Sequence, residues 1–147
     1  MYQRILVPTD GSPLSRKAVA SAVELAARLG AEVVALSVVP NYPVSYFEGG
    51  IGASPDEVAR VERQWAEQGQ AHADVVLEAA ARASVRAKAV TARSELIAEA
   101  ILAAARKHEC DLVVMASHGR KGIQRLLLGS ETLHVLTHGQ VPVLVIR

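Results

Sequence analysis

The segment Leu112-Val113-Val114-Met115-Ala116-Ser117-His118-Gly119 decides the fold and points to a site. Its first four residues form an unbroken apolar run, which is typical of a strand buried on both faces of a parallel sheet. The small residues that follow predict a turn at the carboxyl end of this strand. Nine residues after Gly119, the pair Gly129-Ser130 opens a helical run over 131–136. The first N–H groups of a helix have no intrahelical partner, so the turn and the helix start together predict a phosphate site.

The rest of the chain alternates short apolar strands with helices. Ser12, with Pro13 after it, and Ser94 are candidate N-caps for two of the helices, and Gly30 and Gly139 are stop signals for two. Regular alternation of this kind predicts one α/β domain over 1–147, a doubly wound parallel sheet of five strands with helices on both faces. Strands are predicted at 4–8, 32–39, 85–91, 111–116 and 141–146, helices at 13–29, 55–82, 95–107 and 130–138, and a glycine-rich loop at 41–54.

Composition excludes several classes of protein. Half of the 147 residues are apolar, few are aromatic, and the formal net charge of +1 gives no basic surface for nucleic acid or an anionic membrane. A single cysteine, Cys110, forbids an internal disulfide, fits a reducing compartment and is expected to be a small buried residue. The sequence has no signal peptide pattern and no spanning apolar run, so we expect a soluble cytoplasmic protein.

Two loops follow predicted strands at their carboxyl ends. Pro8-Thr9-Asp10-Gly11-Ser12 follows the first strand, and residues 116–129 follow the fourth. Ligands of doubly wound sheets bind at these ends, where the strand order reverses. If the first and fourth strands are neighbours, the loops line one pocket with an acidic side and a phosphate side, which matches a nucleotide. The sequence contains neither G-x-x-x-x-G-K-[ST] nor, after the first strand, G-x-G-x-x-G.

Four separated segments, residues 5–12, 111–120, 128–130 and 141–146, resemble the universal stress proteins. The resemblance runs in order over essentially the whole chain. It implies a Rossmann-like sheet of strand order 3-2-1-4-5, in which the first and fourth strands are neighbours. It also implies a homodimer that pairs through the fifth strands, here the strand from Val141 to Ile146. That strand is apolar and expected at a sheet edge, which a symmetric partner would cover.

ATP-binding members of that family carry G-x-x-G, nine residues, and then G-[ST]. This chain keeps the spacing and departs from the pattern at one position, where Ala116 replaces the first glycine. Alanine resists positive φ and adds a methyl group where the ligand would approach. The resemblance implies ATP, with or without Mg²⁺, as the ligand. It places Pro8, Thr9, Asp10 and Val38 on the adenine and ribose side, and Ala116, Ser117, His118, Gly119, Arg120, Gly129 and Ser130 around the phosphates.

Three functions remain open at this point. The first is a stress-response regulatory module that binds ATP or a related adenine nucleotide. The second is a homodimeric interaction module without nucleotide, its pocket closed by Ala116. The third is a slow Mg²⁺-dependent ATP hydrolase, although His118 has no evident partner as a base and we name no catalytic residue. His134 and His138 have the spacing of a metal pair on a helix, but no third ligand is evident, so a solvated face is expected.

Overall fold

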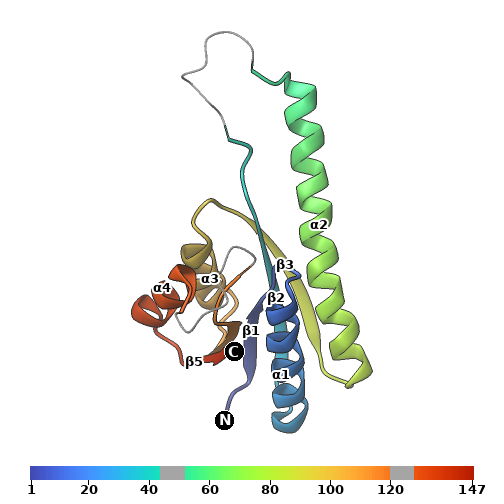
Figure 1. Ribbon diagram of the computed structural model, residues 1–147. Helices are drawn as coiled ribbons and strands as arrows, with labels where there is room; N and C mark the ends of the chain where they lie inside the picture. The colour runs from blue at the N-terminus through green and yellow to red at the C-terminus, as the bar shows by residue number, and fades with distance from the viewer. Residues whose placement is uncertain (44–51, 120–127) are drawn as a thin grey trace.

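The computed structural model describes residues 1–43, 52–119 and 128–147 (Figure 1). All neighbouring strands are parallel, in the order β3-β2-β1-β4-β5, which confirms the predicted α/β sheet. The strands are β1 (Arg4–Pro8), β2 (Glu32–Val39), β3 (Ala87–Arg93), β4 (Leu112–Ala116) and β5 (Val143–Ile146). The helices are α1 (Pro13–Leu29), α2 (Pro55–Arg82), α3 (Ile97–Lys107) and α4 (Ser130–His138).

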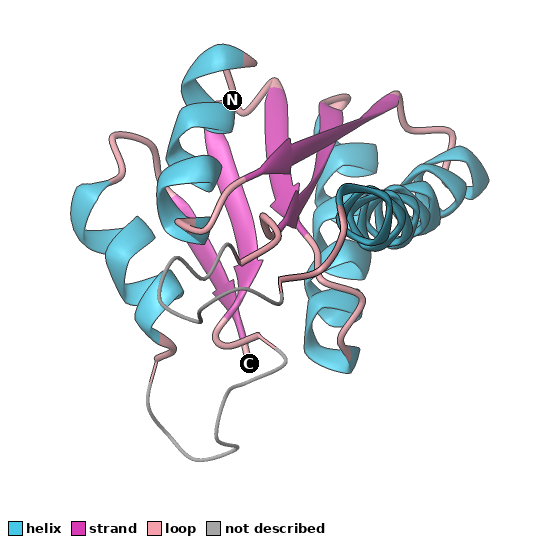
Figure 2. Ribbon diagram, turned by 90° about the horizontal axis from the view of Figure 1, so that it is seen from above, coloured by secondary structure: helices cyan, strands magenta, loops and turns pink. Residues whose placement is uncertain are grey.

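The sheet lies between two helical layers (Figure 2). Successive residues of a strand point to opposite faces of the sheet, so an unbroken apolar strand contributes to a core on each face. Ile5 and Val7 of β1 belong to a core that α1 and α2 cover. Leu6, between them, belongs to a second core under α3 and α4. Alanines such as Ala22 of α1 and Ala105 of α3 are buried in these layers, which lets the helices pack closely against the strands. Both faces of the central strands are therefore buried, as the apolar runs predicted.

The turn from β1 into α1 is built by short-range side-chain bonds. Ser12 is the N-cap of α1, and its hydroxyl accepts the N–H of Ser15 at 3.2 Å. The carboxylate of Asp10 accepts the N–H of Ser12 at 2.9 Å. Asp10 thus supports the helix start while staying at the carboxyl end of β1. Gly30 ends the helix with φ of 68°, as its predicted stop role requires.

The third strand begins two residues later than predicted and ends two residues later. The end of α2 is the reason: the N–H of Val85 bonds to the carbonyl of Ala80 at 2.9 Å, with Ser84 at φ 57°. The N–H of Val85 is therefore bonded within this turn and is not available to pair with β2, so β3 starts later. The fifth strand begins at Val143, because Pro142 has no N–H to donate. The fourth begins one residue late, at Leu112, and the side chain of Asp111 instead accepts the N–H groups of Gln3 and Arg4.

The prediction that Ser94 caps the following helix is wrong. Its hydroxyl accepts the N–H of Leu96 at 3.0 Å in a local turn, and α3 begins only at Ile97. Leu96 is the N-cap and makes no side-chain cap bond. The N–H of Ala98 in the first turn of α3 instead donates to the carboxylate of Glu131, on α4, at 2.8 Å. The start of α3 is therefore capped from another helix.

Of the predicted loop 41–54, residues 41–43 and 52–54 have no regular structure, and 44–51 lie outside the described residues. No helix in the described parts of the chain combines the length and the apolar character needed to cross a bilayer.

Candidate functional site

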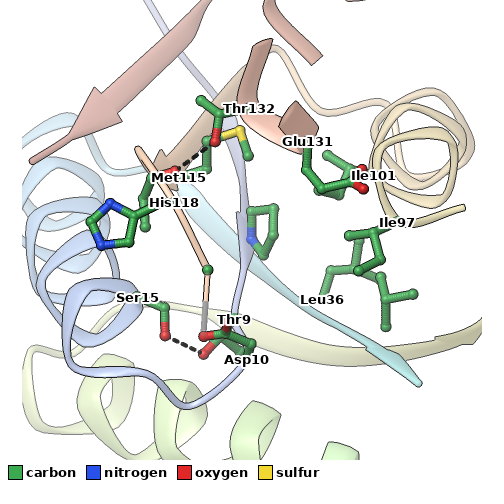
Figure 3. A pocket seen from close by; sticks show the side chains of 14 residues that line it. Thr9, Asp10, Ser15, Leu36, Ile97, Ile101, Met115, His118, Glu131 and Thr132 are labelled. Carbon is green, nitrogen blue, oxygen red and sulfur yellow. Dashed lines mark hydrogen bonds between the residues drawn. The ribbon is translucent and has the colours of Figure 1, made fainter. Parts of the chain in front are cut away.

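A cavity of about 140 Å³ lies at the carboxyl ends of β1, β2 and β4, beside the starts of α3 and α4 (Figure 3). This is the edge of the sheet where the strand order reverses, between β1 and β4. Its walls are mostly apolar, with a few polar side chains among them. The lining residues are Pro8, Thr9, Asp10, Ser15, Leu36, Val38, Ile97, Ile101, Met115, Ala116, His118, Gly119, Glu131 and Thr132.

The structure brings together most of the residues predicted for the site. Ser117 and Ser130 are chain neighbours of lining residues without lining the cavity themselves, and Gly129 lies against the backbone of Ser117 and His118. Arg120 lies outside the described residues. The predicted residues that do line it are Pro8, Thr9, Asp10, Val38, Ala116, His118 and Gly119. The loops after β1 and β4 therefore share one cavity, as the neighbouring position of these strands required.

Thr9 and Asp10 are held firmly at the end of β1. The N–H of Thr9 donates to the carbonyl of Leu36 on β2 at 2.8 Å, and its hydroxyl lies 3.3 Å from that of Ser15. Thr9 is 8% exposed and Ser15 is 4% exposed. The carboxylate of Asp10 lies close to Gly119, since a Cβ added at Gly119 would be 3.0 Å from its Oδ2. Asp10 thus contacts both loops.

Ala116 does not close the cavity. It is the last residue of β4, paired with Ile146 of β5, and it lines the open space with 9% of its surface exposed. Among the described residues other than glycine, only Ser84 and Glu109 have positive φ. The expectation that alanine here would resist a needed left-handed conformation is therefore wrong, because extended strand backbone accepts alanine without strain.

Gly129, at the start of α4, contacts the backbone that directly follows β4. Its N–H donates to the carbonyl of Ser117 at 2.7 Å, so it is not one of the free donors of the predicted phosphate site. Its φ of −61° is open to any residue. A Cβ at this position would lie 3.2 Å from the Ser117 carbonyl oxygen and 3.3 Å from the Cα of His118. Glycine is favoured here because two stretches of backbone approach closely and an added Cβ would crowd them.

The first turn of α4 retains free donors. Within the part of the chain that the structure describes, the N–H groups of Ser130, Glu131 and Thr132 have no hydrogen-bond partner. The hydroxyl of the buried Thr132 donates to the carbonyl of Ala116 at 3.0 Å, which fixes the helix start against the end of β4 (Figure 3). The free N–H groups and the helix dipole make this end of α4 favourable for an anion.

Sequence reasoning missed seven lining residues. Thr132 and Glu131 follow Gly129-Ser130 directly and could have been found from their place in the first helical turn. The apolar residues carry no local signal that separates a cavity wall from a core position. The seven are Ser15, Leu36, Ile97, Ile101, Met115, Glu131 and Thr132.

The other singled-out side chains have structural partners. The ring of His118 lies 3.2 Å from the hydroxyl of Ser117. His134 pairs with Glu99 at 2.7 Å, and its ring stacks on that of His138 with centroids 4.2 Å apart. No group of three or more metal-ligand side chains gathers among the described residues. Burial raises the pKa of Cys110 to about 11, so this thiol stays protonated, as its expected packing role requires.

Comparisons of the sequence identify its family. The family model described as the universal stress protein family matches residues 1–147. A universal stress protein of Methanocaldococcus jannaschii is 34% identical over 148 residues, which cover all of this chain and 83% of the relative. The universal stress protein YxiE of Bacillus subtilis is 30% identical over 149 residues, and each chain is covered completely.

Solved structures of universal stress proteins share the fold of this chain. Universal stress protein UspA from Lactobacillus plantarum is 28% identical, with a TM-score of 0.78 over 99% of this chain and 98% of its own. A universal stress protein solved in complex with cAMP shares the fold at 23% identity, with a TM-score of 0.71 over 99% of this chain and 97% of its own. The Arabidopsis thaliana member solved with AMP bound does so at 16% identity, with a TM-score of 0.69 over 98% and 90%. The chain belongs to the universal stress protein family.

Proposed function

We propose that this protein is a regulatory module that binds an adenine nucleotide in the cavity at the carboxyl ends of β1 and β4. The observation that carries the proposal is the position of that cavity. It joins a largely apolar space at the strand-order reversal to the free N–H groups at the start of α4. A nucleotide has the matching parts, a flat base at one end and phosphate at the other.

The apolar part of the cavity suits the base. Leu36 and Val38 come from β2, Met115 from β4 and Ile101 from α3, so a flat ring would be enclosed from several elements. The carboxylate of Asp10 stands at the lower rim in Figure 3 and is a suitable acceptor for ribose hydroxyls. Thr9 and Ser15 hold this rim in place through their contact.

The polar part suits a phosphate. Three successive N–H groups, from Ser130 to Thr132, face out of the first turn of a nine-residue helix. Ser130 is exposed, so its hydroxyl is accessible as a further donor. Arg120 is the cation that the sequence offers for the remaining charge. The donor set therefore fits an adenylate.

Relatives of the same fold lend support, because members have been solved with AMP, with dAMP and in complex with cAMP. These three ligands share adenine and a single phosphate group, and they differ in the 2′-hydroxyl of the sugar and in whether the phosphate is cyclic. Adenine is accordingly the part of the ligand that the proposal specifies most firmly. The carboxylates of the described lining residues, Asp10 and Glu131, lie on different walls of the cavity. A bound Mg²⁺ ion would therefore be held mainly by the phosphates.

The test is a calorimetric titration of the purified protein with adenosine, AMP and ATP, after release of any nucleotide by denaturation and refolding. We expect saturable binding of at least one adenylate. Gly119→Val should weaken it at least tenfold, because its side chain would enter the cavity beside Asp10. Gly52→Val is the matched control, since a Cβ at Gly52 has no neighbour within 4 Å. Absence of binding by the wild-type protein would reject the proposal and favour the interaction-module function.

We also propose a homodimer that pairs through β5. The carbonyls of Pro142 and Ile146 accept the N–H groups of Val113 in β4 and of Ser117 just after it. The alternate residues Val143 and Val145 therefore present their backbone to the open edge. Three leucines nearby are exposed on β5 and α4: Leu144 by 41%, Leu133 by 54% and Leu136 by 39%. A second copy would cover both the unpaired edge and these side chains.

A further inference from the structure

The wall of the cavity beside the start of α4 carries a negative charge. The charged side chains among the described lining residues are Asp10 and Glu131, and both are acidic. Figure 3 shows them on different walls of the cavity, with Glu131 extending toward Ile101 of α3. A site built only for strongly anionic ligands would not place a carboxylate there, because like charges repel.

The position of Glu131 is determined by a specific contact. Its Oε2 accepts the N–H of Ala98 at 2.8 Å and so caps the helix α3, whose own N-cap residue makes no side-chain bond. Its other oxygen has no hydrogen-bond partner within the described residues. The same residue contributes one of the free N–H groups at the start of α4. The carboxylate is therefore held at the start of α3, about one side-chain length from the N–H groups proposed for the phosphate.

We propose that Glu131 sets the charge selectivity of this pocket, so that affinity for an adenylate falls as its phosphate charge rises. This inference rests on the proposed nucleotide function. Taking a separation of about 8 Å between the carboxylate and a phosphate charge, one pair of like unit charges in water-like surroundings changes an equilibrium by a factor of roughly two to three. AMP carries a charge of about −2 and ATP without metal about −4 near neutral pH. Because ATP carries two more negative charges than AMP, the carboxylate should lower the affinity for ATP about fivefold more than it lowers the affinity for AMP.

Glu131→Gln separates this charge from the cap. The glutamine amide oxygen can still accept the N–H of Ala98, and the side-chain size is almost unchanged, so the charge is the main difference. In a titration with EDTA at low ionic strength, we expect Glu131→Gln to raise ATP affinity relative to AMP affinity by about fivefold. Adenosine, which is uncharged, should bind wild type and variant alike. The charge of Arg120 is the same in wild type and in Glu131→Gln, so it does not affect the difference in affinity between the two proteins.

Two controls make the result specific. Glu99→Gln removes an exposed carboxylate that pairs with His134 and does not line the cavity, and the ratio of ATP to AMP affinity should stay at its wild-type value. Glu131→Ala removes both charge and cap. It should shift the affinity ratio as Glu131→Gln does, with an additional loss of thermal stability. At about 1 M salt, where the Debye length is about 3 Å, the difference between wild type and Glu131→Gln should disappear.

The outcomes separate the selectivity from the proposed function. If wild type binds adenosine and AMP but Glu131→Gln changes the three affinities equally, the selectivity is wrong while the nucleotide function stands. If Glu131→Gln weakens ATP binding, with or without Mg²⁺, the carboxylate attracts the ligand or its metal ion, and the selectivity is likewise wrong. If wild type binds none of the three ligands, both proposals are wrong. A selective gain for ATP that is lost at high salt supports the selectivity.

Discussion

The N–H of Gly129 donates a 2.7 Å hydrogen bond to the carbonyl of Ser117, and this bond joins the turn after β4 to the start of α4. Eleven residues separate the two partners in the chain, yet their backbones touch. The bond sets where the free N–H groups of α4 lie relative to the end of the sheet. The geometry of the proposed phosphate site therefore depends on a close backbone contact in which any side chain at position 129 would be crowded.

Gly129→Ala should reduce both stability and nucleotide affinity. The new Cβ would be 3.2 Å and 3.3 Å from backbone atoms of Ser117 and His118, so the backbone must shift. We expect a loss of about 1–3 kcal/mol in the free energy of unfolding, typical of overpacking, and at least a fivefold loss of AMP affinity. Thermal melts and calorimetry measure the two effects. Gly52→Ala is the control, and unchanged behaviour of Gly129→Ala would show that this contact does not matter.

Ala116→Gly should leave nucleotide affinity within about twofold of the wild-type value. Ala116 already lines an open cavity from extended strand backbone, so its methyl group is not an obstacle. Glycine inside a strand should instead cost about 0.5–1 kcal/mol of stability. Calorimetric titration with AMP decides the point. A gain of tenfold or more in the glycine variant would mean that the methyl group does obstruct the ligand.

Val145→Pro should convert the proposed dimer into a monomer. Proline removes the N–H that Val145 presents to the open edge of β5, and costs no bond to β4. Light scattering after size exclusion at micromolar concentration should give twice the monomer mass for wild type and the monomer mass for the variant. Val145→Thr retains the N–H and the branched shape, so it should remain dimeric. A monomeric wild type would reject the β5 interface.

Acidification should destabilise the protein through His108. Burial lowers the pKa of His108, and the nearby charges of Lys88, Lys107 and Arg4 lower it further. The unfolded chain takes up the proton near pH 6.5, where the folded protein still resists it, so stability falls as the pH drops below that value. In His108→Gln, the fall in melting temperature between pH 7.5 and 5.5 should be smaller than in wild type. His138→Gln, at an exposed position, should retain the wild-type fall.

Much of the fold could be predicted because its signals are local. β1 and β2 begin and end at the predicted residues, since Pro8 and Pro40 stop the strands. Pro55 likewise marks the first residue of α2. The start of β3 could not be predicted, because the turn around Ser84 at the end of α2 uses backbone groups that look available in the sequence. The capping of α3 was missed for a similar reason, since Glu131 reaches it from another helix.

The site was predictable in its position and less so in its chemistry. The neighbouring strands bring Asp10 and Gly119 together, as the order of β1 and β4 required. The role of Gly129 differed from the expected one, because its amide is used within the protein. Which side of a helix faces a cavity depends on packing across the sheet. No local pattern could therefore have placed Ile97 and Ile101 around the ligand space.

A crystal structure of the protein grown with AMP tests the central claim most directly. We predict adenine between β2, β4 and α3, and a phosphate oxygen within about 3 Å of the N–H groups of Ser130 and Glu131, the ordinary hydrogen-bond distance. Density for AMP elsewhere, or an empty cavity at saturating AMP, would contradict the account.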